Sequence, residues 1–134
     1  MASTVFDSTL FRDMFGTAEM RDIFSDEALV GRYLEVEAAL ARAQAQMGVV
    51  PIDAAKAIDA ASRAIAVDYD RLRRETENVG YPILPLVHQL SDAAGEAGRY
   101  VHWGATTQDI MDTANVLQIR AALEIVPRDL GVLR

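Results

Sequence analysis

The feature that most constrains the fold is a recurrence of apolar residues every three or four positions along most of the chain. Between residues 25 and 48 this recurrence is carried by Leu29, Tyr33, Val36, Leu40, Ala43 and Met47. The spacing predicts an α-helix with those side chains on a core face. Ser25 is a favoured N-cap, and Asp26 and Glu27 would then lie at the positive end of the helix dipole.

The same spacing continues toward the C-terminus. It predicts further helices over residues 51–67, 68–78, 84–94 and 108–134. Gly48 is expected to end the first helix, and Pro51 suits the first turn of the second. The run AGEAG, residues 94–98, predicts a turn, and Pro127 predicts a kink in the last helix. Because alternating β-branched residues are scarce, the sequence predicts an all-α fold.

The composition excludes several classes of protein. A chain of 134 residues is one domain or a piece of a larger protein. It has no cysteine, which excludes a disulfide scaffold or a thiolate metal site, and its two histidines are too few for a multi-histidine metal site. The net charge of −7 argues against nucleic acid as a partner, and a single lysine, Lys56, argues against a polybasic membrane patch. No apolar run is long enough to span a membrane and the N-terminus lacks a signal-peptide pattern, so we expect a cytoplasmic protein.

The last predicted helix carries two apolar stripes. One stripe consists of Ile110, Ala114, Leu117 and Ala121, and the other of Val116, Ile119, Leu123 and Val126. A helix that is apolar on more than one face needs neighbours on more than one side. We therefore expect this chain to be the front part of a longer polypeptide, or its last helix to pack in an oligomeric bundle.

The densest group of chemically capable residues lies just before that helix, in residues 99–113. Thr106 or Thr107 is a good N-cap, and Thr106 with Asp109 fits the capping-box spacing. The start of a helix offers unpaired N–H groups and a positive dipole end. Hydroxyl groups and the Gln108 amide add further donors to this segment.

Two small residues, Gly104 and Ala105, would let a ligand approach the backbone closely, and His102 lies just upstream. Together these groups suit the binding of a carboxylate. The alternative is an ordinary helix cap that binds nothing, with His102 as a structural histidine. The capping-box spacing alone does not decide between the two.

A resemblance bears on that choice. Residues 100–113, YVHWGATTQDIMDT, resemble the His-x-Gly-x-Thr-Ser-x-Asp signature of the fumarase/aspartase superfamily, in the branch of 3-carboxy-cis,cis-muconate cycloisomerase and adenylosuccinate lyase. Residues 24–51 are similar to that branch's first long helix and the turn after it. Residues 78–90 resemble the cycloisomerase-like version of the next segment. The resemblance covers nearly the whole chain.

This resemblance implies an architecture. Residues 1–104 would form the N-terminal helical domain of an all-α fold, and residues 105–134 the truncated start of its central helical bundle. The full-length protein would be a homotetramer in which each active site takes residues from three subunits.

The resemblance also implies a chemistry. Family members abstract a proton next to a carboxylate and expel a β-leaving group, or run the reverse addition, through an aci-carboxylate and without a cofactor or metal. His102, Thr106 and Thr107 would hold a carboxylate of a small substrate, with Gln108 helping. The serine base and the general acid would lie downstream, so no catalytic residue is expected in this segment and the segment alone would be inactive.

Departures from the family pattern narrow the expected reaction. Thr107 stands where the family usually has serine, which keeps the hydroxyl. Residues 75–82 contain no histidine, which argues against adenylosuccinate as the substrate. An elimination giving a fumarate-type product, cycloisomerisation of 3-carboxy-cis,cis-muconate, and a non-catalytic helical interaction protein all stay open.

Four further polar residues have expected roles. Asn78 and Tyr81 are candidate substrate contacts, Asn115 is a candidate inward-facing polar residue, and His88 is expected to be structural.

Overall fold

The computed structural model describes residues 4–132, and within them it contains helices and no strand. The elements are η1 (Arg12–Met14), α1 (Ala18–Ile23), α2 (Asp26–Gln46), α3 (Ile52–Ala64), α4 (Tyr69–Val79), α5 (Ile83–Ala94), η2 (Gly95–Tyr100) and α6 (Thr107–Val132). The predicted all-α fold is confirmed. Residues 1–3 and 133–134, which the two expected domain ranges include, lie outside the described residues.

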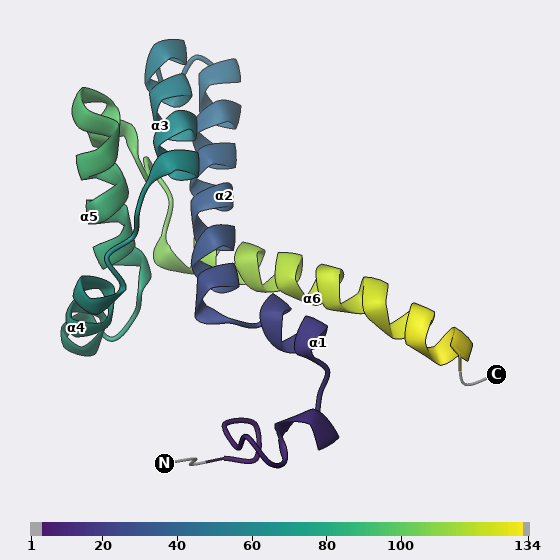
Figure 1. Ribbon diagram of the computed structural model, residues 1–134. Helices are drawn as coiled ribbons and strands as arrows, with labels where there is room; N and C mark the ends of the chain where they lie inside the picture. The colour runs from purple at the N-terminus through teal and green to yellow at the C-terminus, as the bar shows by residue number, and fades with distance from the viewer. Residues whose placement is uncertain (1–3, 133–134) are drawn as a thin grey trace.

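The helices form a short bundle with one long arm. Figure 1 shows α2, α3 and α5 side by side, with α4 at the lower end of α5 and α6 projecting away from the lower half of α2. α2 packs against both α3 and α6, and α1 packs against α6. None of the described helices is long and apolar enough to cross a membrane.

Side-chain caps determine where several helices begin. The Ser25 hydroxyl accepts a hydrogen bond from the Ala28 backbone N–H at 3.1 Å, as predicted for an N-cap. The Asp68 carboxylate accepts one from Arg71 at the start of α4. α4 ends at Val79, and its C-cap is Gly80, whose φ of 92° lies in the left-handed region that favours glycine.

One local prediction is confirmed and two differ from the structure in detail. Gly48 ends α2 as predicted: it follows the C-cap Met47 with φ 71°, and its N–H donates to the Ala45 carbonyl. Pro51 is the N-cap of α3 and not a first-turn residue, because the helix begins at Ile52. The AGEAG run forms the 3-10 helix η2, which continues the chain beyond α5. Pro127 does not interrupt α6, which is continuous to Val132 (Figure 1); the predicted kink at Pro127 stays a prediction.

The core lies where α2, α3 and α5 meet the start of α6. Its largest fully buried side chains are Ile58, Ile83, Leu86, Leu90, Ile110 and Val50. The predicted α2 stripe is only partly correct, because Tyr33 is buried but Ala43 and Met47 are exposed. The observed core face of α2 is rotated toward Val30, Leu34, Ala38 and Ala41. The small alanines on that face allow α3 to pack close to α2.

Helix α6 has one covered face and one uncovered face. Ile110, Ala114 and Ile125 are buried, and Gln118 Nε2 donates to the Ile23 carbonyl of α1 at 2.8 Å. The second predicted stripe is exposed throughout, and it consists of Val116, Ile119, Leu123 and Val126. The described residues therefore leave that apolar stripe without a packing partner.

A glycine in η2 provides a test of this packing. A Cβ on Gly98 would collide with the Ser91 backbone carbonyl of α5. We expect Gly98→Ala to lower the free energy of unfolding by about 1–3 kcal/mol, the range typical of overpacking. The free energy is measured by urea denaturation of the protein.

The matched control is Gly31→Ala in α2, where a Cβ meets nothing within 4 Å. Removing a mid-helix glycine there should stabilise the protein by about 0.5–1 kcal/mol. Equal midpoints of urea denaturation for Gly98→Ala and Gly31→Ala would contradict the packing described for η2.

Candidate functional site

The loop between η2 and α6 has an unusual backbone. His102 has φ 58° and is the one described non-glycine residue with positive φ, and Gly104 has φ 68°. The Ala105 N–H donates to the His102 carbonyl at 3.3 Å, which closes a tight turn between them. A histidine in the left-handed region is uncommon and is retained where the surroundings hold it.

Helix α2 holds this loop at two points. The Glu37 carboxylate lies 2.6 Å from His102 Nδ1, measured from Oε1. About two helical turns further along, Gln44 Nε2 donates to the Trp103 carbonyl at 2.6 Å. The same helix that forms the core therefore positions the loop.

Neither α2 residue was among the predicted site residues. Glu37 is 2% exposed and lies on the same side of α2 as Tyr33 and Ala41. The other positions at this helical spacing carry apolar residues that would be expected in the core. A glutamate among them is the signal that could have identified Glu37. The residue that it contacts is 65 positions away in the sequence, so the spacing alone could not name the partner.

The electrostatics of the loop favour a charged His102. The hydrogen bond to Glu37 raises the pKa of His102, and burial of the ring opposes this effect. The negative charges of Glu37 and Asp109 raise it further. An ionised Glu37 requires the proton on Nδ1, so the imidazolium form also carries an N–H at Nε2.

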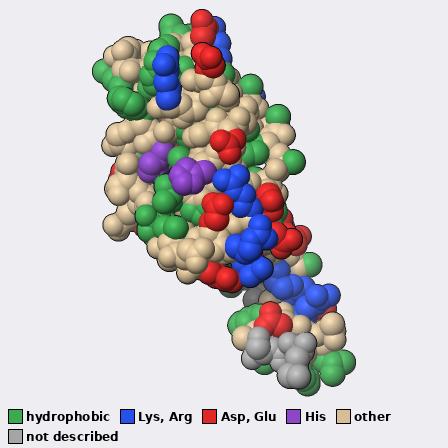
Figure 2. Space-filling model, turned by 90° about the vertical axis from the view of Figure 1, so that its left-hand side faces the viewer, with side chains coloured by type: hydrophobic (Ala, Val, Ile, Leu, Met, Phe, Trp, Pro, Cys, Tyr) green, Lys and Arg blue, Asp and Glu red, His purple; other side chains and the backbone are tan. Residues whose placement is uncertain are grey.

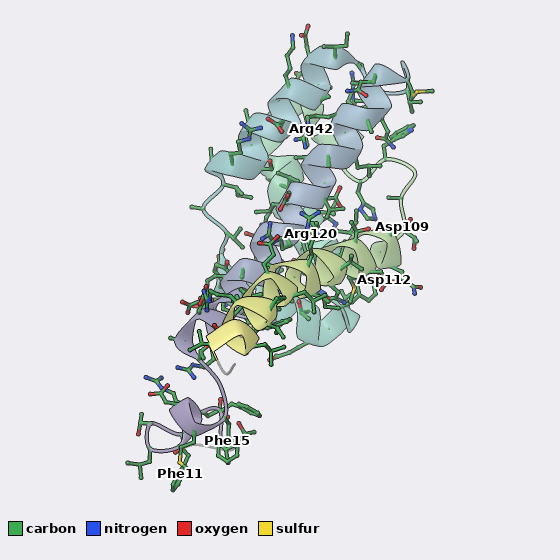
Figure 3. All side chains as sticks on the ribbon, turned by 90° about the vertical axis from the view of Figure 1, so that its right-hand side faces the viewer. Phe11, Phe15, Arg42, Asp109, Asp112 and Arg120 are labelled. Carbon is green, nitrogen blue, oxygen red and sulfur yellow. The ribbon has the colours of Figure 1, made fainter. Side chains whose placement is uncertain are left out.

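The start of α6 supplies the other predicted residues. Thr106 precedes the helix, and its backbone N–H donates to Asp109 Oδ2 at 2.9 Å, which is the reciprocal half of a capping box. Thr107 is the first helical residue and is half-buried. Gln108 is exposed, and its amide donates to Asp112 at 3.1 Å within the same helix. Figure 3 shows Asp109 and Asp112 at the start of α6.

This arrangement brings the predicted residues into one short segment at the surface. His102 and Thr106 lie in the loop, and Thr107 is the first residue of α6. Trp103, in the same loop, is 51% exposed. The loop can offer hydroxyl groups, an imidazole and helix-start N–H groups to an anion. Among residues 4–132, no cluster of three or more histidine, aspartate or glutamate side chains could hold a metal ion.

The remaining candidates lie elsewhere. Asn115 is exposed on α6 and the neighbouring Ala114 takes the buried position, so Asn115 does not face the core of the described residues. Asn78 and Tyr81 are exposed around the end of α4. His88 is exposed on α5 rather than packed in the core. Figure 2 shows both histidines on one face of the molecule, next to each other.

The pairing of His102 predicts a pH-dependent stability. Because the pKa of His102 is higher in the folded chain than in the unfolded chain, its protonation stabilises the fold. This contribution is fully present below the pKa of His102 in the unfolded chain, about 6.5, and it is lost as the pH rises through the pKa of His102 in the folded chain. We expect the difference in unfolding free energy between the wild type and His102→Gln to shrink over that window in urea titrations.

The exposed histidine gives the matched control for this measurement. His88→Gln makes the same chemical change outside the Glu37 contact, and it should leave the contribution of the Glu37–His102 pair to stability in place. A constant difference between the wild type and His102→Gln at every pH would contradict the assigned pairing.

Comparisons with known proteins agree with this fold. A family model described as "Lyase" matches residues 15–134. The crystal structure of a fumarate lyase from Mesorhizobium sp. BNC1 is 60% identical, with a TM-score of 0.83 over 85% of this chain and 27% of that chain. The structure of beta-carboxy-cis,cis-muconate cycloisomerase from Acinetobacter calcoaceticus sp. ADP1 is 43% identical, with a TM-score of 0.88 over 92% of this chain and 30% of that chain.

A relative with a known sequence is also a lyase. An N-acetyl-S-(2-succino)cysteine lyase from Enterococcus italicus is 42% identical over 133 residues, which are 99% of this chain and 29% of that protein. The chain thus spans less than a third of the length of the relatives that it matches.

Proposed function

The chain belongs to this lyase family, the fumarase/aspartase superfamily that residues 100–113 resemble, and on that basis we propose the reaction of the full-length protein. It catalyses a general-base β-elimination, or the reverse addition, on a small carboxylate substrate through an aci-carboxylate intermediate. The product is of the fumarate type. No metal or organic cofactor takes part, and the working form is a homotetramer.

The observation that carries this proposal is a histidine held by a buried carboxylate beside the start of α6. In the proposed reaction, charge builds up on a carboxylate as the neighbouring carbon loses its proton. Donors fixed in advance around that carboxylate stabilise the transition state more than the substrate. His102 Nε2–H, the hydroxyl groups of Thr106 and Thr107, and the first N–H groups of α6 are suitable donors, with Gln108 at the edge of the group.

The proposal divides the work between this chain and the rest of the protein. Residues 1–104 form the N-terminal helical domain, and α6 begins the central bundle. The serine base and the general acid lie outside residues 1–134, so residues 1–134 by themselves do not turn over substrate. The exposed apolar stripe of α6 is consistent with further helices packing there in the assembled enzyme.

The cycloisomerase reaction is the second candidate. It is favoured by the TM-score of 0.88 to the beta-carboxy-cis,cis-muconate cycloisomerase from Acinetobacter calcoaceticus sp. ADP1. The two candidates share the carboxylate site and differ in the nucleophilic group that leaves or adds at the β-carbon. In the elimination this group becomes a separate product, and in the cycloisomerisation it is a carboxylate of the same substrate. Assaying the full-length protein with succinyl adducts and with 3-carboxy-cis,cis-muconate separates them, because only one of these substrate classes should be consumed.

Removal of the hydroxyl groups tests the carboxylate site. In the full-length enzyme we expect the double variant Thr106→Val and Thr107→Val to lose roughly 10²–10³-fold in kcat/KM, as when an oxyanion donor is removed. Steady-state kinetics with the substrate found above measures this loss.

The control for that variant is Thr107→Ser, which retains the hydroxyl and places the serine usual in the family at this position; it should keep kcat/KM close to the wild-type value. Unchanged turnover in the double valine variant would show that these hydroxyl groups do not contact the substrate.

A further inference from the structure

Glu37 is the one charged residue among the buried side chains of the described chain. It lies in the middle of α2, and its neighbours on that face, Tyr33, Ala38 and Ala41, are buried as well. Burying a carboxylate is expensive unless it is paired, and a buried pair is often no more stable than apolar residues of similar size. Packing alone therefore does not account for a glutamate at this position.

The contacts of Glu37 point toward the loop. Its Oε1 atom receives the His102 Nδ1–H, and its Oε2 atom is buried without a hydrogen-bond partner among the described residues. The His102 ring is therefore the group that this carboxylate holds. Gln44 holds the adjacent Trp103 carbonyl, so the loop cannot rotate away from α2 without losing both contacts.

This contact determines what the far side of the ring can do. With a carboxylate at Nδ1, neutral His102 presents a lone pair at Nε2, and protonated His102 presents an N–H. Only the protonated form can donate to a carboxylate ligand. The charge of Glu37 favours this form, in the way that opposite charges within hydrogen-bond distance stabilise each other.

We propose that Glu37 is a positioning residue, which orients the His102 ring and keeps it charged so that Nε2–H can bind the substrate carboxylate. This inference rests on the proposed function, because it assumes that His102 meets a carboxylate. Glu37 itself does not touch the substrate. It acts from α2 through the ring that it holds.

Asp109 of α6 also acts electrostatically on the His102 ring and must be kept constant. His88 of α5 lies next to His102 on one face of the molecule (Figure 2) and must be kept constant too. Each of these groups is retained when Glu37 alone is changed.

The decisive variant is Glu37→Gln in the full-length protein, because it removes the charge but keeps an oxygen acceptor of the same reach. The matched control is Glu35→Gln, which removes a half-exposed carboxylate of the same helix that pairs with Arg32. The titration of His102 is followed by NMR with labelled histidine, and the resonance is assigned with His102→Asn.

We expect Glu37→Gln to lower the pKa of His102, because it removes the charged hydrogen-bond acceptor that raises it, and Glu35→Gln to leave it in place. In kinetics, Glu37→Gln should raise KM at neutral pH, by at most about tenfold for each unit by which the pKa of His102 falls below the assay pH. Lowering the pH should restore KM because it restores the imidazolium, and kcat at saturating substrate should change less. A role confined to packing would give a loss that is the same at every pH.

Two results would overturn the inference: an unchanged His102 titration in Glu37→Gln, or a KM defect that low pH does not relieve. If Glu37→Gln does not fold, the wild-type titration decides, because a His102 pKa at or below about 6.5 contradicts the pairing. The NMR titration needs no substrate. A protein without lyase activity whose His102 still responds to Glu37→Gln would refute the proposed function alone, whereas an active lyase with an unresponsive His102 would refute the inference alone.

Discussion

The packing of α2 against both α3 and α6 is the constraint on which the rest of the structure depends. One side of α2 is made of small and aliphatic residues that let α3 approach closely, and it continues into contacts with the start of α6. Because α6 begins beside α2, the loop that precedes it must pass along the same helix. The candidate site therefore lies on a rigid helix surface, although its residues belong to a loop and a helix terminus.

The buried carboxylate of Glu37 shows how the core and the site share one element. Along α2, apolar residues hold the bundle together, and a glutamate and a glutamine interrupt them at positions that face the loop. Interior polar groups of this kind add little to stability, because desolvation offsets much of the attraction. Their effect is to select one loop conformation, including a His102 backbone that is rarely adopted without support.

Helix α6 combines two roles in one segment. Its first turn carries Thr107 and Gln108, two of the residues that the family resemblance assigns to the carboxylate, and its later turns carry an apolar stripe that the described residues leave exposed. A helix of this kind transmits the placement of its N-terminus to whatever packs along its length.

The sequence by itself determined the helices and the location of the candidate site. Local rules are sufficient for this, because a cap such as Ser25, a glycine such as Gly80 and a regular apolar spacing act within a few residues of one another. The signature around His102 is likewise local. Tertiary structure alone decided which face of α2 became the core and which distant groups hold the loop. Glu37 and His102 are 65 residues apart, and their pairing exists only because α2 and α6 pack together. No periodicity within a single helix encodes the partner of a buried charge.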